Sequence, residues 1–124
     1  MAIDVTDATF ETDVLARSNS AAVVVDLWAP WCGPCTQLGP ILERVCDATE
    51  GKVVLAKVNV DENPGISQAF NVQSIPLVVA IKDGQAVNGF LGAQPENKVR
   101  EFVEQLLPSE QESALAQLIA AGDE

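Results

Sequence analysis

Histidine is absent from this sequence of 124 residues, and cysteine occurs only three times. A structural zinc site requires four cysteine or histidine ligands, and an iron–sulfur cluster usually requires four cysteines. Covalent haem attachment needs a histidine directly after the second cysteine of a CXXC motif, where this chain has Thr36. One chain of this sequence therefore cannot complete any of these three kinds of site.

Basic residues are also scarce, since seven lysines and arginines stand against 18 aspartates and glutamates, for a formal net charge of −11. Such an acidic chain is poorly suited to bind nucleic-acid phosphates or anionic membrane surfaces. No apolar run approaches the ~18 residues of a membrane span, and residues 1–5 lack the basic flank and apolar segment of a secretion signal. We therefore expect protein partners, no nucleic acid, no membrane and a cytoplasmic location.

Hydrophobic residues make up 48% of the chain, which at this length fills the core of one domain. We expect this domain to span residues 1–107, followed by a helical tail over 108–124. Apolar runs and helical spacing predict strands over 3–5, 22–29, 53–60, 76–82 and 86–91, and helices over 7–17, 34–50, 64–70 and 95–107. The second and third strands should be parallel, and the last two antiparallel across the short turn between them. The predicted fold class is α/β with a mixed sheet.

The segment Trp31-Cys32-Gly33-Pro34-Cys35 lies where the strand over 22–29 gives way to the helix over 34–50. Residues three apart in a first helical turn are neighbours, so the two cysteines can form a disulfide without backbone movement. The helix N-terminus favours the thiolate of Cys32 and lowers its pKa below the ~8.5 of a free thiol. We interpret the pair as a redox centre with Cys32 as its nucleophile.

The third cysteine, Cys46, lies eleven residues beyond Cys35 on the same predicted helix. At 1.5 Å rise per residue this separation is about 16 Å, which is too far for a disulfide with the pair. We expect Cys46 to be a buried, inert thiol on the core face of the helix.

Asp26 stands inside the apolar strand over 22–29, where an ionised carboxylate must leave water at a cost of several kcal/mol. Burial would raise its pKa and make it a candidate to exchange a proton with Cys35. Lys57 is the only charge in the run over 53–60 and is its expected partner. The pattern alone leaves two other interpretations open, namely a structural ion pair and an edge position facing water.

The tail begins at Pro108, which ends the preceding helix, and Ser109 and Glu112 form a capping-box pattern that predicts a new helix. Its apolar stripe of Leu115, Leu118 and Ile119 either packs on the domain or faces a partner. We expect a monomer, and the tail is the surface on which a weak dimer would form.

The segments VVVDLWAPWCGPC, AKVNVDENP, SIPLVVAIKDG and FLGAQ occur in this order and resemble the thioredoxin family across about residues 5–107. The resemblance implies a thioredoxin fold, with four or five strands flanked by helices, to which this chain adds a short C-terminal helix. It implies a cytoplasmic protein-disulfide reductase that exchanges disulfides at Cys32 and Cys35, with a buried Asp26 paired with Lys57.

The resemblance further implies a cis peptide bond at Ile75-Pro76 and a groove for client proteins with disulfides or exposed apolar segments. That groove would be lined by Trp31, Gly33, Pro34, Ile75, Pro76 and Gly92. No bound cofactor would be needed, because an external NADPH-dependent flavoprotein, similar to thioredoxin reductase, would reduce the Cys32–Cys35 disulfide again.

The chain departs from the common family pattern at Thr36 and Leu77, where lysine and threonine are usual. The lost cation removes one source of thiolate stabilisation next to the pair and changes the surface that a reductase would meet. Residues 88–112 also resemble the end of the thioredoxin domain in holdase chaperones that join it to tetratricopeptide repeats. The alternative function is therefore a redox-linked holdase, or the client-binding domain of a larger protein of that kind.

Overall fold

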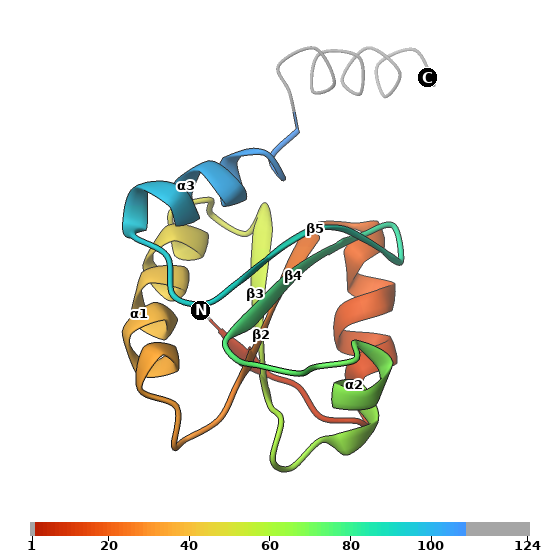
Figure 1. Ribbon diagram of the computed structural model, residues 1–124. Coiled ribbons are helices and arrows are strands. Elements are labelled where there is room, and N and C mark those ends of the chain that lie inside the picture. Colours follow the sequence, from red (N-terminus) through yellow and green to blue (C-terminus); the bar gives the residue numbers. More distant parts are fainter. Residues whose placement is uncertain (1, 109–124) are drawn as a thin grey trace.

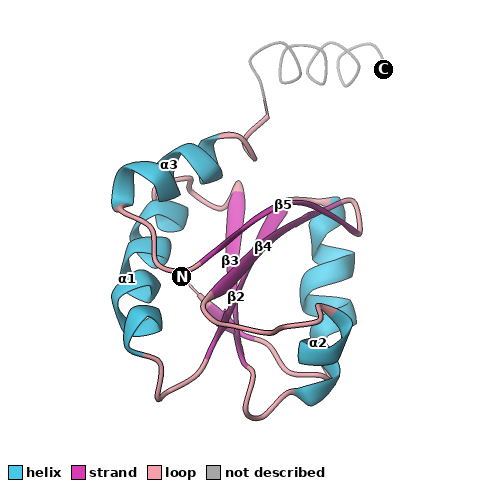
Figure 2. Ribbon diagram, in the orientation of Figure 1, coloured by secondary structure: helices cyan, strands magenta, loops and turns pink. Residues whose placement is uncertain are grey.

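The computed structural model describes residues 2–108, which form a five-stranded sheet with helices on both faces (Figures 1 and 2). The strands, in the order β1-β3-β2-β4-β5, are β1 (Ile3–Asp4), β3 (Val53–Asn59), β2 (Ala22–Trp28), β4 (Leu77–Lys82) and β5 (Gln85–Leu91). One face carries the helices α1 (Gly33–Asp47) and α3 (Glu96–Glu104). The other carries η1 (Glu11–Ala16), η2 (Arg17–Asn19) and α2 (Pro64–Ala69). The predicted α/β thioredoxin fold is confirmed.

Strand directions bring four loops to one end of the sheet. β2 runs parallel to β3 and antiparallel to β4, and β5 returns antiparallel to β4, as predicted for the last two strands. The chain therefore leaves β2, β3 and β5, and enters β4, at the same end. We call this the cysteine end and define it by its loops, residues 29–32, 60–63, 70–76 and 92–95.

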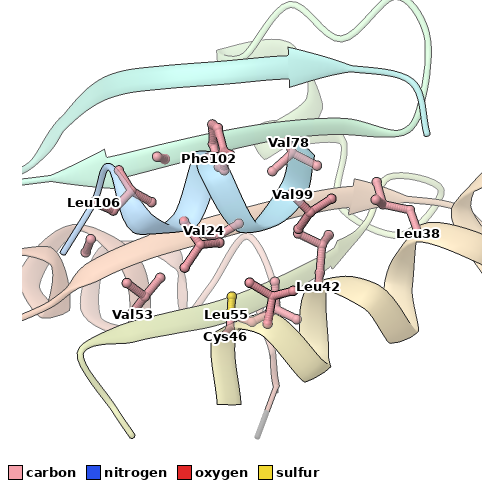
Figure 3. Close-up of a cluster of buried hydrophobic side chains, with 14 residues drawn as sticks. Val24, Leu38, Leu42, Cys46, Val53, Leu55, Val78, Val99, Phe102 and Leu106 are labelled. Carbon is pink, nitrogen blue, oxygen red and sulfur yellow. The ribbon is translucent and has the colours of Figure 1, made fainter. Parts of the chain in front are cut away.

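The side chains of β2 alternate between two cores, which explains why nearly the whole strand is apolar. Val23, Val25 and Leu27 point to the face covered by η1 and α2. Val24 points to the opposite face, where it joins Leu42 and other residues of α1 and α3 (Figure 3). Asp26 follows Val24 in this alternation and therefore lies beneath α1.

The predicted first helix is present but is wound differently. Instead of one α-helix over 7–17, the chain forms a π-helix, η1, followed by the 3₁₀ turn η2. Ser18 fixes the end of this segment, because its hydroxyl donates to the Leu15 carbonyl (2.6 Å) and accepts from the Gly84 amide (2.8 Å). The segment is thereby tied to the turn between β4 and β5.

α3 begins one residue later than predicted, and its regular part ends at Glu104 before a tighter final turn over 105–107. Leu106 in this turn is buried against the core between α1, α3 and the sheet. The predicted tail helix over 109–124, its capping box and its apolar stripe lie outside the described residues. Within residues 2–108, every helix is too short or too polar to cross a lipid bilayer.

Candidate active site

Cys32 and Cys35 form a disulfide at the junction of β2 and α1. Cys32 has an extended backbone and is the N-cap of α1, with its amide donating to the Ala29 carbonyl (3.1 Å). Its Sγ accepts a hydrogen bond from the Cys35 amide (3.2 Å), and the two Cα atoms are 5.3 Å apart. The strand and the helix end therefore fix the pair in the geometry that the sequence predicted.

The residues expected to line a client groove gather around this disulfide. Trp31 is 70% exposed, Gly33 and Pro34 are exposed beside it, and both cysteines are only 5% exposed. Ile75 packs against the cysteines, and the Ile75-Pro76 peptide bond is cis, as expected. Gly92, at φ +86°, donates its amide to the Pro76 carbonyl (2.8 Å). The expected residues thus converge from three loops of the cysteine end and from the first turn of α1.

A groove of about 400 Å³ lies beside the disulfide, lined by Trp31, Val60, Val72, Gln73, Ser74 and Ile75. Sequence reasoning identified only Trp31 and Ile75 of these six residues. Val60 directly follows β3, and in a parallel pair this places it beside the end of β2, so its position offered a signal. Residues 72–74 belong to a loop without a regular pattern, and the sequence alone gave no signal for them.

Trp31 is fixed at the rim of this groove by a hydrogen bond that sequence reasoning also missed. Its indole Nε1 donates to Oδ2 of Asp61 (2.9 Å), and Asp61 belongs to the loop after β3. The Asp61 amide in turn donates to Oδ1 of Asn59 (3.0 Å). A carboxylate is therefore held next to the exposed indole ring.

Asp26 is buried on the face of β2 that α1 covers, with 1% of its surface exposed. Burial raises the pKa of its carboxyl to about 6, Lys57 opposes this shift, and Glu43 adds to it. Within residues 2–108 its Oδ1 has no hydrogen-bond partner. The carboxyl is thus an acid that can hold or release a proton close to neutral pH.

Lys57 lies opposite Asp26 in the register of β2 and β3, but the expected ion pair is not formed. Among the described ion pairs none joins these two side chains. The ammonium instead lies 5.0 Å from the ring centroid of Trp28, in a cation–π contact. Lys57 therefore acts on Asp26 through space rather than by direct contact.

Cys46 is buried in the core on the face of α1 opposite solvent, 3% exposed, and is the free cysteine of the chain. Burial, reinforced by the negative charge of Asp47, raises the pKa of its thiol to about 12. The predicted burial of this thiol is confirmed. In the described part of the chain no group of three or more potential metal ligands gathers at any point.

Comparison with known proteins places these features in one family. The thioredoxin family profile matches residues 1–105. The chain is 43% identical to a thioredoxin of Chlorobaculum thiosulfatiphilum over 102 residues, covering 82% of this chain and 93% of the relative. It is 40% identical to thioredoxin 1 of Nostoc sp. over 106 residues (86% and 97%), and 45% identical to a thioredoxin of Rhodospirillum rubrum over 100 residues (81% and 94%).

The expected likeness to holdase chaperones finds no support in these comparisons. Most of the segment that suggested it, residues 88–112, lies within the match to the thioredoxin profile, which ends at residue 105. The three relatives are named as thioredoxins and are covered almost completely. The chain belongs to the thioredoxin family and is a thiol-disulfide oxidoreductase, a disulfide reductase that works through its redox-active pair Cys32 and Cys35.

Proposed function

We propose that Cys32 is the attacking thiol and Cys35 the resolving thiol in the reduction of client disulfides. The observation that carries this assignment is the position of Cys32 as N-cap of α1, where its sulfur accepts the Cys35 amide hydrogen. A hydrogen bond to sulfur and the positive end of the helix dipole both stabilise a thiolate there. Cys35 lies one turn further into the helix and has no such position.

The reaction proceeds in two exchanges. In the first, the Cys32 thiolate attacks one sulfur of the client disulfide, forming a mixed disulfide and releasing the other client sulfur as a thiolate, which takes up a proton. In the second, Cys35 loses its proton and attacks the Cys32 sulfur, releasing the remaining client thiolate. Two electrons pass from the dithiol to the client, and the Cys32–Cys35 disulfide is left.

Asp26 is the proposed acceptor of the Cys35 proton. It lies on the face of β2 beneath α1, and its pKa of about 6 leaves it ionised but basic at neutral pH. Lys57 has the supporting role of holding positive charge nearby when Asp26 is ionised. Because the ammonium is fixed over the Trp28 ring, this effect does not depend on a direct ion pair.

The client is an extended segment that carries its disulfide to the groove between Trp31 and Ile75. Gly33, Pro34, Pro76 and Gly92 complete this surface, and backbone next to Ile75 can pair with the client chain. An external NADPH-dependent flavoprotein supplies two electrons to restore the dithiol, and no cofactor needs to be bound. We assign the protein to the cytoplasm, as a monomer.

Cysteine variants test these roles. Cys32→Ser should abolish reduction of a disulfide-linked peptide by the prereduced protein, because an alcohol is scarcely ionised at neutral pH. Cys35→Ser should instead accumulate a mixed disulfide, measurable by mass spectrometry. Cys46→Ser is the matched control and should reduce the peptide at the parental rate. Substantial turnover by Cys32→Ser would show that Cys32 is not the attacking thiol. The absence of an adduct with Cys35→Ser would show that Cys35 is not the resolving thiol.

The direction of electron flow is tested separately by equilibration against glutathione. A reductase should have a reduction potential close to the value typical of thioredoxins, which is about −270 mV. Strongly oxidising relatives have a potential of about −120 mV, and a value close to this would instead make the protein an oxidant of its clients.

A further inference from the structure

The cysteine end of the molecule carries negative charge and almost no positive charge. Three stretches form the loops of this end and most of their surroundings, residues 27–42, 58–81 and 84–95, and the charged residues in them are Asp61 and Glu62. Asp7, from the segment after β1, adds a carboxylate nearby, but both of its oxygens accept amide hydrogens at the start of α2. The first turn of α1 supplies no cation either, because Thr36 occupies the position after Cys35 and its hydroxyl donates to the Gly33 carbonyl (2.6 Å).

The seven basic residues all lie elsewhere. Three of them, Arg17, Lys52 and Lys82, stand at the opposite end of the sheet, next to the starts of β2 and β3 and the end of β4. Three more lie on α1 and α3 and pair with carboxylates there, Arg44 and Arg100 with Glu96 and Lys98 with Glu101. Lys57 is half-buried, with its ammonium over the Trp28 ring. Within residues 2–108, none of them forms an ion pair with Asp61 or Glu62.

The two carboxylates are held in place rather than free to swing away. Asp61 accepts the Trp31 indole hydrogen through Oδ2, and Glu62 accepts from Nδ2 of Asn59 through Oε1 (3.2 Å). Each carboxylate keeps a second oxygen that has no hydrogen-bond partner within residues 2–108. Because Trp31 also lines the groove, a fixed negative charge stands beside the place where the client disulfide must approach.

We propose that Asp61 and Glu62 select clients that carry lysine or arginine close to the attacked cysteine. This inference rests on the proposed function, since it names the class of segment that the same groove takes. A basic side chain in the client meets an anchored carboxylate, whereas an acidic one meets like charge with no cation nearby to offset it. The preference acts on encounter with the client and should weaken as salt screens it.

Three disulfide-cyclised peptides that differ only in Lys, Gln or Glu two residues from the first cysteine test this proposal. The measurement is the second-order rate constant for reduction by the prereduced protein, at about 0.02 M and about 0.5 M salt. We expect Lys to exceed Glu by about tenfold at low salt and by less than about twofold at high salt. The ratio of the two constants cancels any effect of the carboxylates on the Cys32 thiolate itself, since both peptides react with the same thiol.

The variant with Asp61→Asn and Glu62→Gln should bring the Lys-to-Glu ratio at low salt below about twofold. The asparagine oxygen can still accept the Trp31 indole hydrogen. The matched control, Asp83→Asn with Glu104→Gln, changes the net charge equally at positions away from the cysteine end and should keep the parental ratio.

Equal rates for the Lys and Glu peptides at low salt, or a parental ratio in the Asp61 and Glu62 variant, would overturn the selection while the proposed reduction stands. Failure to reduce even the Gln peptide would overturn both.

Discussion

At the scale of single residues, Asp26 combines a structural cost with a chemical use. Its carboxyl is buried without a direct ion pair, and its pKa of about 6 lies well above the ordinary 3.8. A pKa raised on folding means that the folded state binds the proton more tightly than the unfolded chain. The stability associated with the protonated acid is therefore present below pH 3.8 and is lost as the pH rises through 6.

Asp26→Asn removes this cost, because the amide has the shape of the protonated acid and never ionises. The difference between the two pKa values corresponds to about 3 kcal/mol, so the variant should be more stable by up to this amount at pH 7. The gain should shrink between pH 6 and pH 4 and vanish below that. Urea unfolding at a series of pH values measures it, and resolution of the mixed disulfide should be slower at neutral pH.

Glu11→Gln, an exposed carboxyl on η1, is the control and should change the unfolding free energy little at any pH. A gain for Asp26→Asn that is the same at pH 4 and pH 7 would show that ionisation of Asp26 is not its cause.

Residue chemistry was predictable only where the pattern along the chain determined it. Burial of Asp26 was expected because apolar residues surround it on a strand, although the pattern also left an edge position facing water open, and the cysteine pair was recognised from its spacing. The partner of Lys57 was not predictable in the same way. An ammonium at this register position can turn toward the carboxylate or toward the Trp28 ring, and the side-chain rotamer decides between them.

At the scale of elements, α2 depends on a residue far away in the sequence. The carboxylate of Asp7 accepts the amide hydrogens of Gly65 (2.9 Å) and Ile66 (2.8 Å), which are free donors at the start of this short helix. The Asp7 amide donates to Oδ1 of Asn63 (2.9 Å). The Asn63 side chain, directly before the helix, makes no capping bond to it.

Asp7→Ala should therefore lower the free energy of unfolding by about 1 to 2 kcal/mol, the usual cost of losing a helix cap. Asp7→Asn should lie between the parent and the alanine variant, because one amide oxygen can replace part of the carboxylate. Urea unfolding measures all three proteins, with Glu11→Ala as the control for an exposed carboxyl in the same region. A loss no greater than that of the control would show that α2 does not need this cap.

The order and type of the main elements were predictable because each has a regular apolar pattern. The Asp7 cap was not predictable. Asp7 lies 58 positions from Gly65 and 59 from Ile66 along the chain, and no sequence pattern links them. The π-helical form of η1 could not be predicted from the sequence pattern either, because the spacing of Phe10, Val14 and Leu15 suits an α-helix equally well.

At the scale of the whole molecule, we expect the domain to fold without residues 109–124. Residues 2–108 contain a five-stranded sheet with helices on both faces, and Leu106 is buried in the core beside α3. Removing residues 109–124 should therefore change the free energy of unfolding by less than about 2 kcal/mol and leave disulfide reduction intact.

A chain ending at Glu104 is the matched comparison, since it also lacks Leu106 and should lose about 2 to 5 kcal/mol. Urea unfolding of the three chains measures both effects. A loss above about 2 kcal/mol from the shorter truncation would make the tail a part of the core.

The central position of β2 has a consequence for how long the cysteine pair keeps its geometry. Val23 to Leu27 are hydrogen-bonded to β3 on one side and to β4 on the other, beneath helices on both faces. β5, by contrast, forms an edge of the sheet and is largely exposed. Amide hydrogens of β5 can exchange with solvent through local opening, whereas those of β2 should exchange only through global unfolding. Cys32 is therefore attached to the strand that opens last, so its position persists for as long as the molecule stays folded.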